Sequence, residues 1–224
     1  MAPQIVRTAA EAVAEISDGS TVLIGGFGNA GQPMELIDAL LDSGASSLTV
    51  VNNNAGQGDA GLALLIKERR VAKVICSFPR QSDSWHFDAA YRAGEIELEL
   101  VPQGNLAERI RAAGAGIGGF FTPTGYGTML AEGKETRMID GRGYVLETPI
   151  HADVALIKAL HADEYGNLVY RKTARNFGPI MATAARNAIV QVEQILPIGA
   201  LNPEHVVTPG IYVNTLVALE GAEA

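Results

Sequence analysis

A predicted buried strand of four residues runs directly into a glycine-rich loop in the segment Thr21-Val22-Leu23-Ile24-Gly25-Gly26-Phe27-Gly28-Asn29-Ala30-Gly31. Pro33 follows at a position that suits the first turn of a helix, and residues 35–41 continue with an apolar pattern typical of a helix. A strand, a glycine loop and a helix in this order are typical of an α/β fold. Glycines in such a loop let the backbone approach a ligand, and free N–H groups at the start of a helix attract anions.

Predicted strands and helices alternate through the first half of the chain. In chain order, they are a helix at 8–16, a strand at 48–51, a helix at 62–69, a strand at 73–76, a helix at 84–92, a strand at 96–100 and a helix at 105–113. This alternation predicts a mostly parallel central sheet that is flanked by helices on both faces. Ligands of such sheets bind outside the carboxyl ends of the strands.

The second half of the chain does not continue the alternation of strands and helices. Glycines crowd a predicted loop at 114–128, and the segments that follow are predicted as strands at 143–146, 154–159, 168–170, 188–192 and 211–216, with one helix at 179–187. The sequence therefore predicts a mixed, β-rich C-terminal part. We find no linker, repeat or low-complexity tract, so one domain over residues 1–224 is the simplest interpretation.

Composition excludes several classes of protein. The 224 residues are 47% hydrophobic and 19% charged, which is typical of a globular protein, and the net charge of −8 does not suit a general nucleic-acid binder. The single cysteine, Cys76, excludes an internal disulfide and fits a reducing cytoplasm. The longest run without a polar side chain, 112–121, is shorter than the ~20 residues of a membrane span, and no secretory signal is visible at the start. We expect a cytoplasmic protein that does not cross a membrane.

The glycine loop also matches the dinucleotide-binding pattern Gly-x-Gly-x-x-Gly at 26–31. A dinucleotide fold requires an acidic side chain after the second strand for the ribose hydroxyls, whereas this chain has Asn52, Asn53 and Asn54 there. Amide groups donate hydrogen bonds and suit a carbonyl or a carboxylate better. An NAD-dependent dehydrogenase is therefore the weaker interpretation. The four histidines show no metal-ligand spacing, and Cys76, at the end of an apolar strand, is interpreted as a small core residue.

Five motifs in order carry a resemblance to a known family. They are residues 25–33, residues 53–56 (Asn-Asn-Ala-Gly), residues 102–109 (Pro-Gln-Gly-Asn-Leu-Ala-Glu-Arg), residues 121–128 and residues 170–177 (Tyr-Arg-Lys-Thr-Ala-Arg-Asn-Phe). Together they resemble the A (alpha) subunit of the 3-oxoacid coenzyme A transferases over nearly the whole chain. Residues 76–84 (Cys-Ser-Phe-Pro-Arg-Gln-Ser-Asp-Ser) resemble the 3-oxoadipate branch of that family.

The resemblance implies an activity that needs a second chain. Family members move CoA from succinyl-CoA to a 3-oxo acid through a glutamyl-CoA thioester, with CoA thioester as substrate and no tightly bound cofactor or metal. The family's nucleophilic glutamate lies on a B (beta) subunit in a Ser-Glu-Asn-Gly segment, which this chain lacks. The implied partner is a B subunit, in a heterodimer or an A2B2 heterotetramer. Glu147, at the end of a predicted strand, is the alternative nucleophile within this chain.

The resemblance also implies site residues. The loop formed by Gly25, Gly26, Phe27, Gly28, Asn29, Ala30 and Gly31 corresponds to the family's CoA-binding loop. Asn53 and Gln103 correspond to amides that hydrogen-bond the reacting groups, and both follow predicted strands. Arg80 is the candidate for binding the second carboxylate of 3-oxoadipate, because guanidinium binds carboxylates in a bidentate way.

Two other interpretations stay open at this point. The first keeps the family but changes the acceptor to acetoacetate or a similar 3-oxo acid. The second is a non-catalytic sensor that uses the glycine loop to bind CoA or another phosphate-bearing ligand. A sensor binds its ligand as a complete module, whereas one half of a transferase gains activity only with the chain that supplies the missing glutamate.

Overall fold

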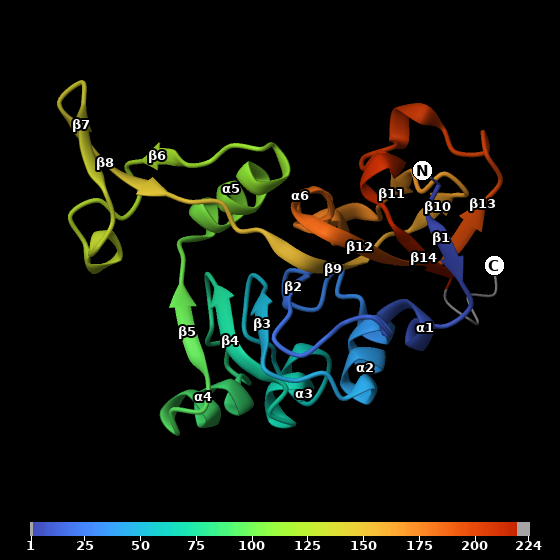
Figure 1. The fold of residues 1–224 in the computed structure, drawn as a ribbon, viewed down its shortest axis with the longest axis horizontal. Helices are drawn as coiled ribbons and strands as arrows, with labels where there is room; N and C mark the ends of the chain where they lie inside the picture. Colours follow the sequence, from blue (N-terminus) through green and yellow to red (C-terminus); the bar gives the residue numbers. More distant parts are fainter. Residues whose placement is uncertain (1, 219–224) are drawn as a thin grey trace.

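The computed structural model describes residues 2–218 and is built on one eight-stranded parallel sheet (Figure 1). The strands lie in the order β1 (Gln4–Val6), β14 (Thr215–Ala218), β12 (Ala185–Val192), β9 (Ala152–Lys158), β2 (Thr21–Ile24), β3 (Leu48–Val51), β4 (Val71–Cys76) and β5 (Glu97–Leu100). Every neighbouring pair in this sheet is parallel. The predicted α/β fold with a parallel central sheet is confirmed.

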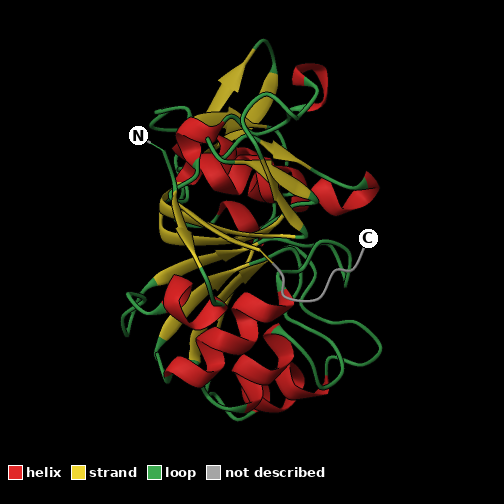
Figure 2. Ribbon diagram, turned by 90° about the vertical axis from the view of Figure 1, so that its right-hand side faces the viewer, coloured by secondary structure: helices red, strands yellow, loops and turns green. Residues whose placement is uncertain are grey.

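Helices cover both faces of the sheet, which Figure 2 shows nearly edge-on between two groups of helices. The first group is α1 (Ala9–Val13), α2 (Met34–Ser43), α3 (Leu62–Lys67) and α4 (Trp85–Arg92), and the second is α5 (Gln103–Gly114) and α6 (Gly178–Ala184). Successive strand residues point to opposite faces, so Val22 and Ile24 pack with the first group and Leu23 with the second. The molecule therefore has two apolar cores, one on each face of the sheet.

Two small sheets flank this body. An antiparallel sheet of β6 (Phe120–Thr122), β8 (Arg142–Glu147) and β7 (Thr136–Ile139) extends at the upper left of Figure 1. A mixed sheet consists of β11 (Leu168–Val169), β10 (His161–Asp163) and β13 (Gln194–Leu196). The short 3-10 helices are η1 (Met129–Ala131), η2 (Lys172–Arg175), η3 (Pro203–His205) and η4 (Gly210–Tyr212). The expected mixed, β-rich C-terminal part is confirmed.

Some predicted boundaries were wrong. Residues 185–187, predicted as the end of a helix, begin β12, because they pair in parallel with the start of β9. Residues 211–214, predicted as strand, precede β14, and Gly210–Tyr212 form η4 directly after Pro209. Part of the predicted loop 114–128 is β6, which pairs with β8. In each case a long-range contact or a proline turn outweighs the local pattern.

The parallel arrangement places the carboxyl ends of β2, β3, β4, β9 and β12 along one edge of the sheet. The loops that leave this edge begin at Gly25, Asn52, Ser77, Ala159 and Glu193. Since ligands of open parallel sheets collect there, this carboxyl edge is where a site is expected. Within residues 2–218, no helix is long and apolar enough to cross a membrane.

Candidate active site

Asn53 is the centre of the polar contacts at the carboxyl edge. The residue is 4% exposed, and its Oδ1 accepts hydrogen bonds from Ser77 Oγ at 2.7 Å and from Gln103 Nε2 at 2.8 Å. Within residues 2–218, its Nδ2 makes no hydrogen bond. Two donors on Oδ1 fix the orientation of the amide, because its two ends are not interchangeable. Nδ2 is thus left as a donor for a group outside this chain.

The neighbouring asparagines have a supporting role instead. Asn52 Nδ2 donates to the Ile24 carbonyl at 2.6 Å, and Asn52 Oδ1 accepts from the backbone N–H of Asn54 at 2.9 Å. Asn54 Oδ1 accepts from the backbone N–H of Gly56 at 3.0 Å. Both side chains are fully buried, so they shape the loop after β3. Asn53 and Gln103, the two amides predicted from the sequence, are in direct contact in the fold.

The glycine loop after β2 is held tightly to its surroundings. Phe27 and Ala30 exchange two backbone hydrogen bonds, which closes a narrow turn. At Gly31, φ is +77° and an added Cβ would lie 2.4 Å from the Ala174 carbonyl oxygen. At Gly26, φ is +127° and a Cβ would lie 2.6 Å from the Gln32 side chain. Both positions require glycine for conformation and for space.

Asn176 attaches this loop to the segment that contains η2, and its role was not predicted from the sequence. Its Oδ1 accepts from the backbone N–H of Gly26 at 3.2 Å, and its Nδ2 donates to the carbonyls of Ala30 at 3.0 Å and Thr173 at 2.9 Å. The signal that could have indicated it is its place in the motif at 170–177 that carries the family resemblance. Asn176 is therefore a positioning residue for the glycine loop.

Arg80 lies in the loop between β4 and α4, two residues after Phe78, whose N–H donates to the Asn53 carbonyl at 3.0 Å. Its side chain is 56% exposed, and its Nε contacts Asp88 Oδ1 at 2.6 Å. No hydrogen bond joins Arg80 to Asn53 or to Gln103 in the described chain. The fold brings Arg80 to the carboxyl edge but not into the amide pair.

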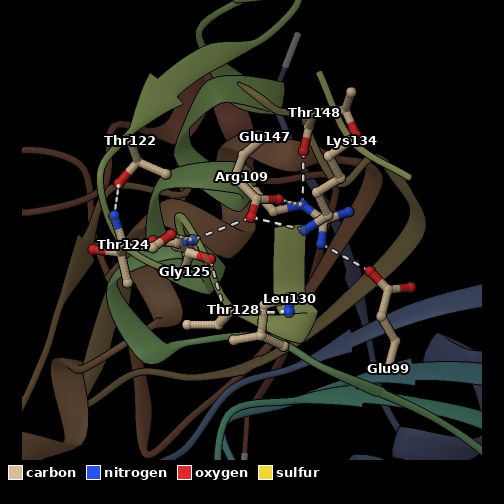
Figure 3. A network of polar contacts seen from close by, with 11 residues as sticks. Glu99, Arg109, Thr122, Thr124, Gly125, Thr128, Leu130, Lys134, Glu147 and Thr148 are labelled. Carbon is tan, nitrogen blue, oxygen red and sulfur yellow. Dashed lines mark hydrogen bonds and ion pairs between the residues drawn. The ribbon is translucent and has the colours of Figure 1, made fainter. Parts of the chain in front are cut away.

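Glu147, the alternative nucleophile, is engaged in a buried ion-pair network (Figure 3). The residue is 3% exposed, and its Oε1 accepts from Lys134 Nζ at 2.9 Å and from Asn105 Nδ2 at 3.1 Å. Arg109 Nε lies 3.8 Å from Oε2, and Arg109 also donates to Glu99 at 2.8 Å. These contacts join β8 and the loop before β7 to α5 and β5. They favour a structural role for Glu147.

The same network shifts the titration of Glu99. Burial alone raises the pKa of this carboxyl, but hydrogen bonds from Arg109 and Lys73 outweigh burial and hold the pKa below its usual value. A lowered pKa in the folded state means that the carboxylate contributes stability at neutral pH. That contribution is lost as the pH falls through the lowered pKa.

Cys76 is not available for chemistry. The thiol is fully buried at the end of β4, and desolvation raises its pKa to about 12. It is therefore protonated at neutral pH and cannot act as a thiolate nucleophile. This agrees with its interpretation as a core residue. Among the residues that the structure describes, no group of three or more His, Cys, Asp or Glu side chains is arranged to hold a metal ion.

Comparisons with known proteins agree with the fold and with the motifs. The family described as "Coenzyme A transferase" matches residues 6–219. The A chain of the 3-oxoadipate CoA-transferase of Pseudomonas putida is 66% identical over 215 residues, which cover 96% of this chain and 93% of that protein. The corresponding chain of the succinyl-CoA:3-ketoacid coenzyme A transferase of Xanthomonas campestris pv. campestris (strain B100) is 55% identical, over 90% of this chain and 83% of that protein.

Among solved structures, an acyl-CoA transferase of Escherichia coli O157:H7 superposes with a TM-score of 0.86 at 22% identity. The match covers 99% of this chain and 48% of the bacterial enzyme. At this level of identity the superposition shows a shared fold. The family match and the relatives named above extend over nearly the whole sequence, including the glycine loop, Asn53 and Gln103. This chain belongs to the coenzyme A transferase family.

Proposed function

We propose that this chain is the alpha subunit of a CoA-transferase that moves CoA from succinyl-CoA to 3-oxoadipate, giving succinate and 3-oxoadipyl-CoA. It acts as a single domain with a B subunit, in the β-ketoadipate pathway of aromatic-compound catabolism. The observation that carries this proposal is the oriented amide of Asn53, whose Oδ1 is occupied by Ser77 and Gln103 while Nδ2 stays available. The Pseudomonas putida relative's name supports the choice of acid.

The chemistry requires a donor at this place. A carboxylate of the partner attacks the thioester carbonyl, and negative charge develops on the acyl oxygen. A fixed donor such as Asn53 Nδ2 stabilises that charge without having to reorganise during the step. The CoA thiolate leaves, which gives a mixed anhydride of glutamate and succinate, and the thiolate then attacks the glutamyl carbonyl and releases succinate. The resulting glutamyl-CoA thioester passes its CoA to the acceptor acid by the same steps in reverse. One thioester replaces another, so the exchange needs no ATP.

The glycine loop is suited to bind the CoA thioester beside this amide. Its conformation depends on glycines at 26 and 31, and Asn176 holds it in place from a distant part of the chain. The loop leaves β2, which is the immediate neighbour of the strand that precedes Asn53. A thioester lying along the loop would bring its carbonyl to the carboxyl end of β3.

Partner dependence tests the proposed function. The purified chain alone is expected to show no transfer of CoA from succinyl-CoA to 3-oxoadipate, because the nucleophilic glutamate is on the other subunit. Mixing with the B subunit should restore transfer, and mass spectrometry should find the thioester on the B chain. Transfer by the isolated chain through a glutamate of its own would refute the proposal. So would ligand binding without any transfer in the complex, which is the behaviour of a sensor.

Arg80 is proposed to bind the far carboxylate of 3-oxoadipate. In the two-subunit complex, Arg80→Ala should raise the KM for 3-oxoadipate about tenfold, as expected for the loss of one partly exposed charge-assisted contact. Formation of the protein-bound thioester from succinyl-CoA should be unaffected. The matched control is Arg92→Ala, which also removes a cation near Asp88. Arg92 lies on α4, one helix turn after Asp88, and not in the loop that contains Arg80. Equal effects of both variants would contradict the assignment.

A second candidate acceptor is acetoacetate or a similar short 3-oxo acid. The name of the Xanthomonas campestris relative supports it, because that protein is described as acting on a 3-ketoacid. The unmodified complex discriminates between the two acceptors. A higher kcat/KM for acetoacetate than for 3-oxoadipate would exclude the dicarboxylic acid as the main substrate. It would also contradict the proposal that Arg80 binds a second carboxylate of the acceptor.

A further inference from the structure

Arg80 lies on a short loop, residues 77–84, that is attached at both ends to the loop of Asn53. At the first end, the backbone N–H groups of the first two residues donate to the Asn53 carbonyl at 3.2 and 3.0 Å. At the second end, Ser84 Oγ donates at 2.8 Å to the carbonyl of Gly56, which follows Asn53 in the same loop. The place of this Arg80 loop relative to Asn53 therefore depends on these attachments.

The hydroxyl of Ser84 connects the two loops directly. Besides donating to Gly56, it accepts a hydrogen bond at 3.0 Å from the backbone N–H of Gln81, the residue after Arg80. Ser84 is 5% exposed, so water has little access to either contact. A hydroxyl has one proton to donate and lone pairs to accept with, and here both functions are used. Ser84 thus joins the backbone beside Arg80 to the loop that carries the reacting amide.

This use of the hydroxyl is unusual for its position. Ser84 immediately precedes α4, where the side chain of a serine commonly accepts a hydrogen bond from an N–H of the first helical turn. The Ser84 side chain makes no such capping bond, because its oxygen is directed to Gln81 and Gly56 instead. The hydroxyl therefore contributes to the placement of the Arg80 loop and not to the start of the helix.

Other contacts hold α4 to the Asn53 loop independently of this hydroxyl. The Gly58 N–H donates to the Asp83 carbonyl at 2.9 Å, and His86 Nε2 lies 2.7 Å from Asp59 Oδ1. These contacts remain when the Ser84 hydroxyl is removed. Its loss should therefore loosen the Arg80 loop and leave the surrounding fold in place.

The Arg80 guanidinium has donors available for an acid. Asp88 Oδ1 accepts from its Nε at 2.6 Å, and its two terminal nitrogens make no hydrogen bond within residues 2–218. Guanidinium nitrogens bind a carboxylate through two parallel hydrogen bonds, which requires a defined position of the side chain. The attachment of the loop supplies part of that definition.

The chemistry of the acceptor makes the separation of the two loops important. 3-Oxoadipate has a carboxylate at each end of its carbon chain, so a reacting end at Asn53 leaves the far end within a limited reach. The far carboxylate meets Arg80 only if the Arg80 loop keeps its place. Acetoacetate has no second carboxylate, and the second carboxylate of succinyl-CoA is on a shorter chain. Neither of these two depends on the loop in the same way.

We propose that Ser84 is a positioning residue for the acceptor acid. Its hydroxyl fixes the Arg80 loop relative to Asn53 and so favours a dicarboxylic 3-oxo acid over a monocarboxylic one. This inference rests on the proposed function and deepens it, because it names a residue that sets the choice of acceptor without touching it.

The test measures both acceptors in the complex with the B subunit. The readout is the ratio of kcat/KM for 3-oxoadipate to kcat/KM for acetoacetate. Ser84→Ala should lower this ratio about fivefold, the order of effect of losing one hydrogen bond. The single-turnover rate of thioester formation from succinyl-CoA should not change. Ser82→Ala is the matched control and should change neither quantity, because Ser82 is exposed and its hydroxyl makes no hydrogen bond in the part of the chain that the structure describes.

A double substitution tests whether Ser84 acts through Arg80. In the Arg80→Ala complex the far carboxylate has no guanidinium to reach, so adding Ser84→Ala should not lower the ratio further. Additive effects of the two substitutions overturn the proposal, and so does an unchanged ratio in Ser84→Ala alone.

Other outcomes of the Ser84→Ala measurement also decide the matter. Equal losses with both acceptors, slower thioester formation or loss of the complex in size-exclusion chromatography overturn the proposal, because Ser84 would then support the whole site or the fold. Failure of the proposed function is seen separately, as absence of transfer from succinyl-CoA to 3-oxoadipate in the unmodified complex.

Discussion

Replacing Asn53 by alanine in the assembled two-subunit enzyme is expected to lower kcat about 10²–10³-fold, the usual effect of removing one donor to a developing oxyanion. The fold should survive, because the hydrogen bonds to the Asn53 backbone carbonyl from Ser77 and Phe78 do not need the side chain. The rate of thioester formation on the B subunit, measured in a single turnover with succinyl-CoA, reports the step directly. KM should change little, since the contact strengthens only as charge develops.

Substitutions of Gln103 test whether the orientation of the Asn53 amide matters for the rate. Gln103 Nε2 donates to Asn53 Oδ1, so Gln103→Glu places a carboxylate oxygen against another acceptor. The Asn53 amide relieves this repulsion by turning over, which presents its oxygen to the thioester. Gln103→Glu should therefore lose nearly as much rate as Asn53→Ala, whereas Gln103→Ala, which leaves Ser77 as a donor, should lose much less. Equal effects of the two Gln103 variants would contradict the orienting role.

The placement of Asn53 and Gln103 after strands of the sheet could be predicted, because each follows an apolar segment and precedes a turn or a helix, and local patterns determine such positions. Their role as site residues stays a prediction. Their direct hydrogen bond could not, since Asn53 and Gln103 are 50 residues apart. The sequence treats the two amides as equivalent donors. In the structure their positions differ: Gln103 Nε2 donates to Asn53 Oδ1, and Asn53 Nδ2 makes no hydrogen bond within residues 2–218.

The contacts of Asn176 show more clearly what could not be predicted from the sequence. Asn176 contacts Gly26, which lies 150 residues away in the sequence, because β9 pairs in parallel with β2 and β12 pairs in parallel with β9. Parallel strands are joined by long crossovers and leave no hairpin signal to reveal which strands are neighbours. A cavity lined by Gly31 of the glycine loop, Lys158 at the end of β9 and Glu193, the residue after β12, depends on the same pairing. Contacts of this kind depend on packing rather than on a local pattern.

Glu147→Ala is expected to destabilise the complex by about 3–5 kcal/mol, the usual cost of breaking a buried ion pair from one side. Lys134, Asn105 and the largely buried Arg109 would lose the carboxylate that they share. Chemical denaturation of the assembled enzyme, followed by circular dichroism, measures the loss. Glu135→Ala is the matched control, because Glu135 pairs with Arg137 on the exposed surface near the same sheet and should cost less than about 1 kcal/mol.

A second substitution of Glu147 tests which of the two chains carries the nucleophile. Glu147→Gln keeps an acceptor for Asn105 but removes the negative charge that Lys134 and Arg109 neutralise. If Glu147 is structural, this variant is less stable but still forms the protein-bound thioester on the B subunit at temperatures where it is folded. If a folded Glu147→Gln complex forms no thioester, the nucleophile lies in this chain. The proposal that the B subunit supplies the nucleophilic glutamate is then wrong. The buried position of Glu147 and its contacts with Lys134 and Arg109 favour the first outcome, because a carboxylate already held by two cations is a poor nucleophile.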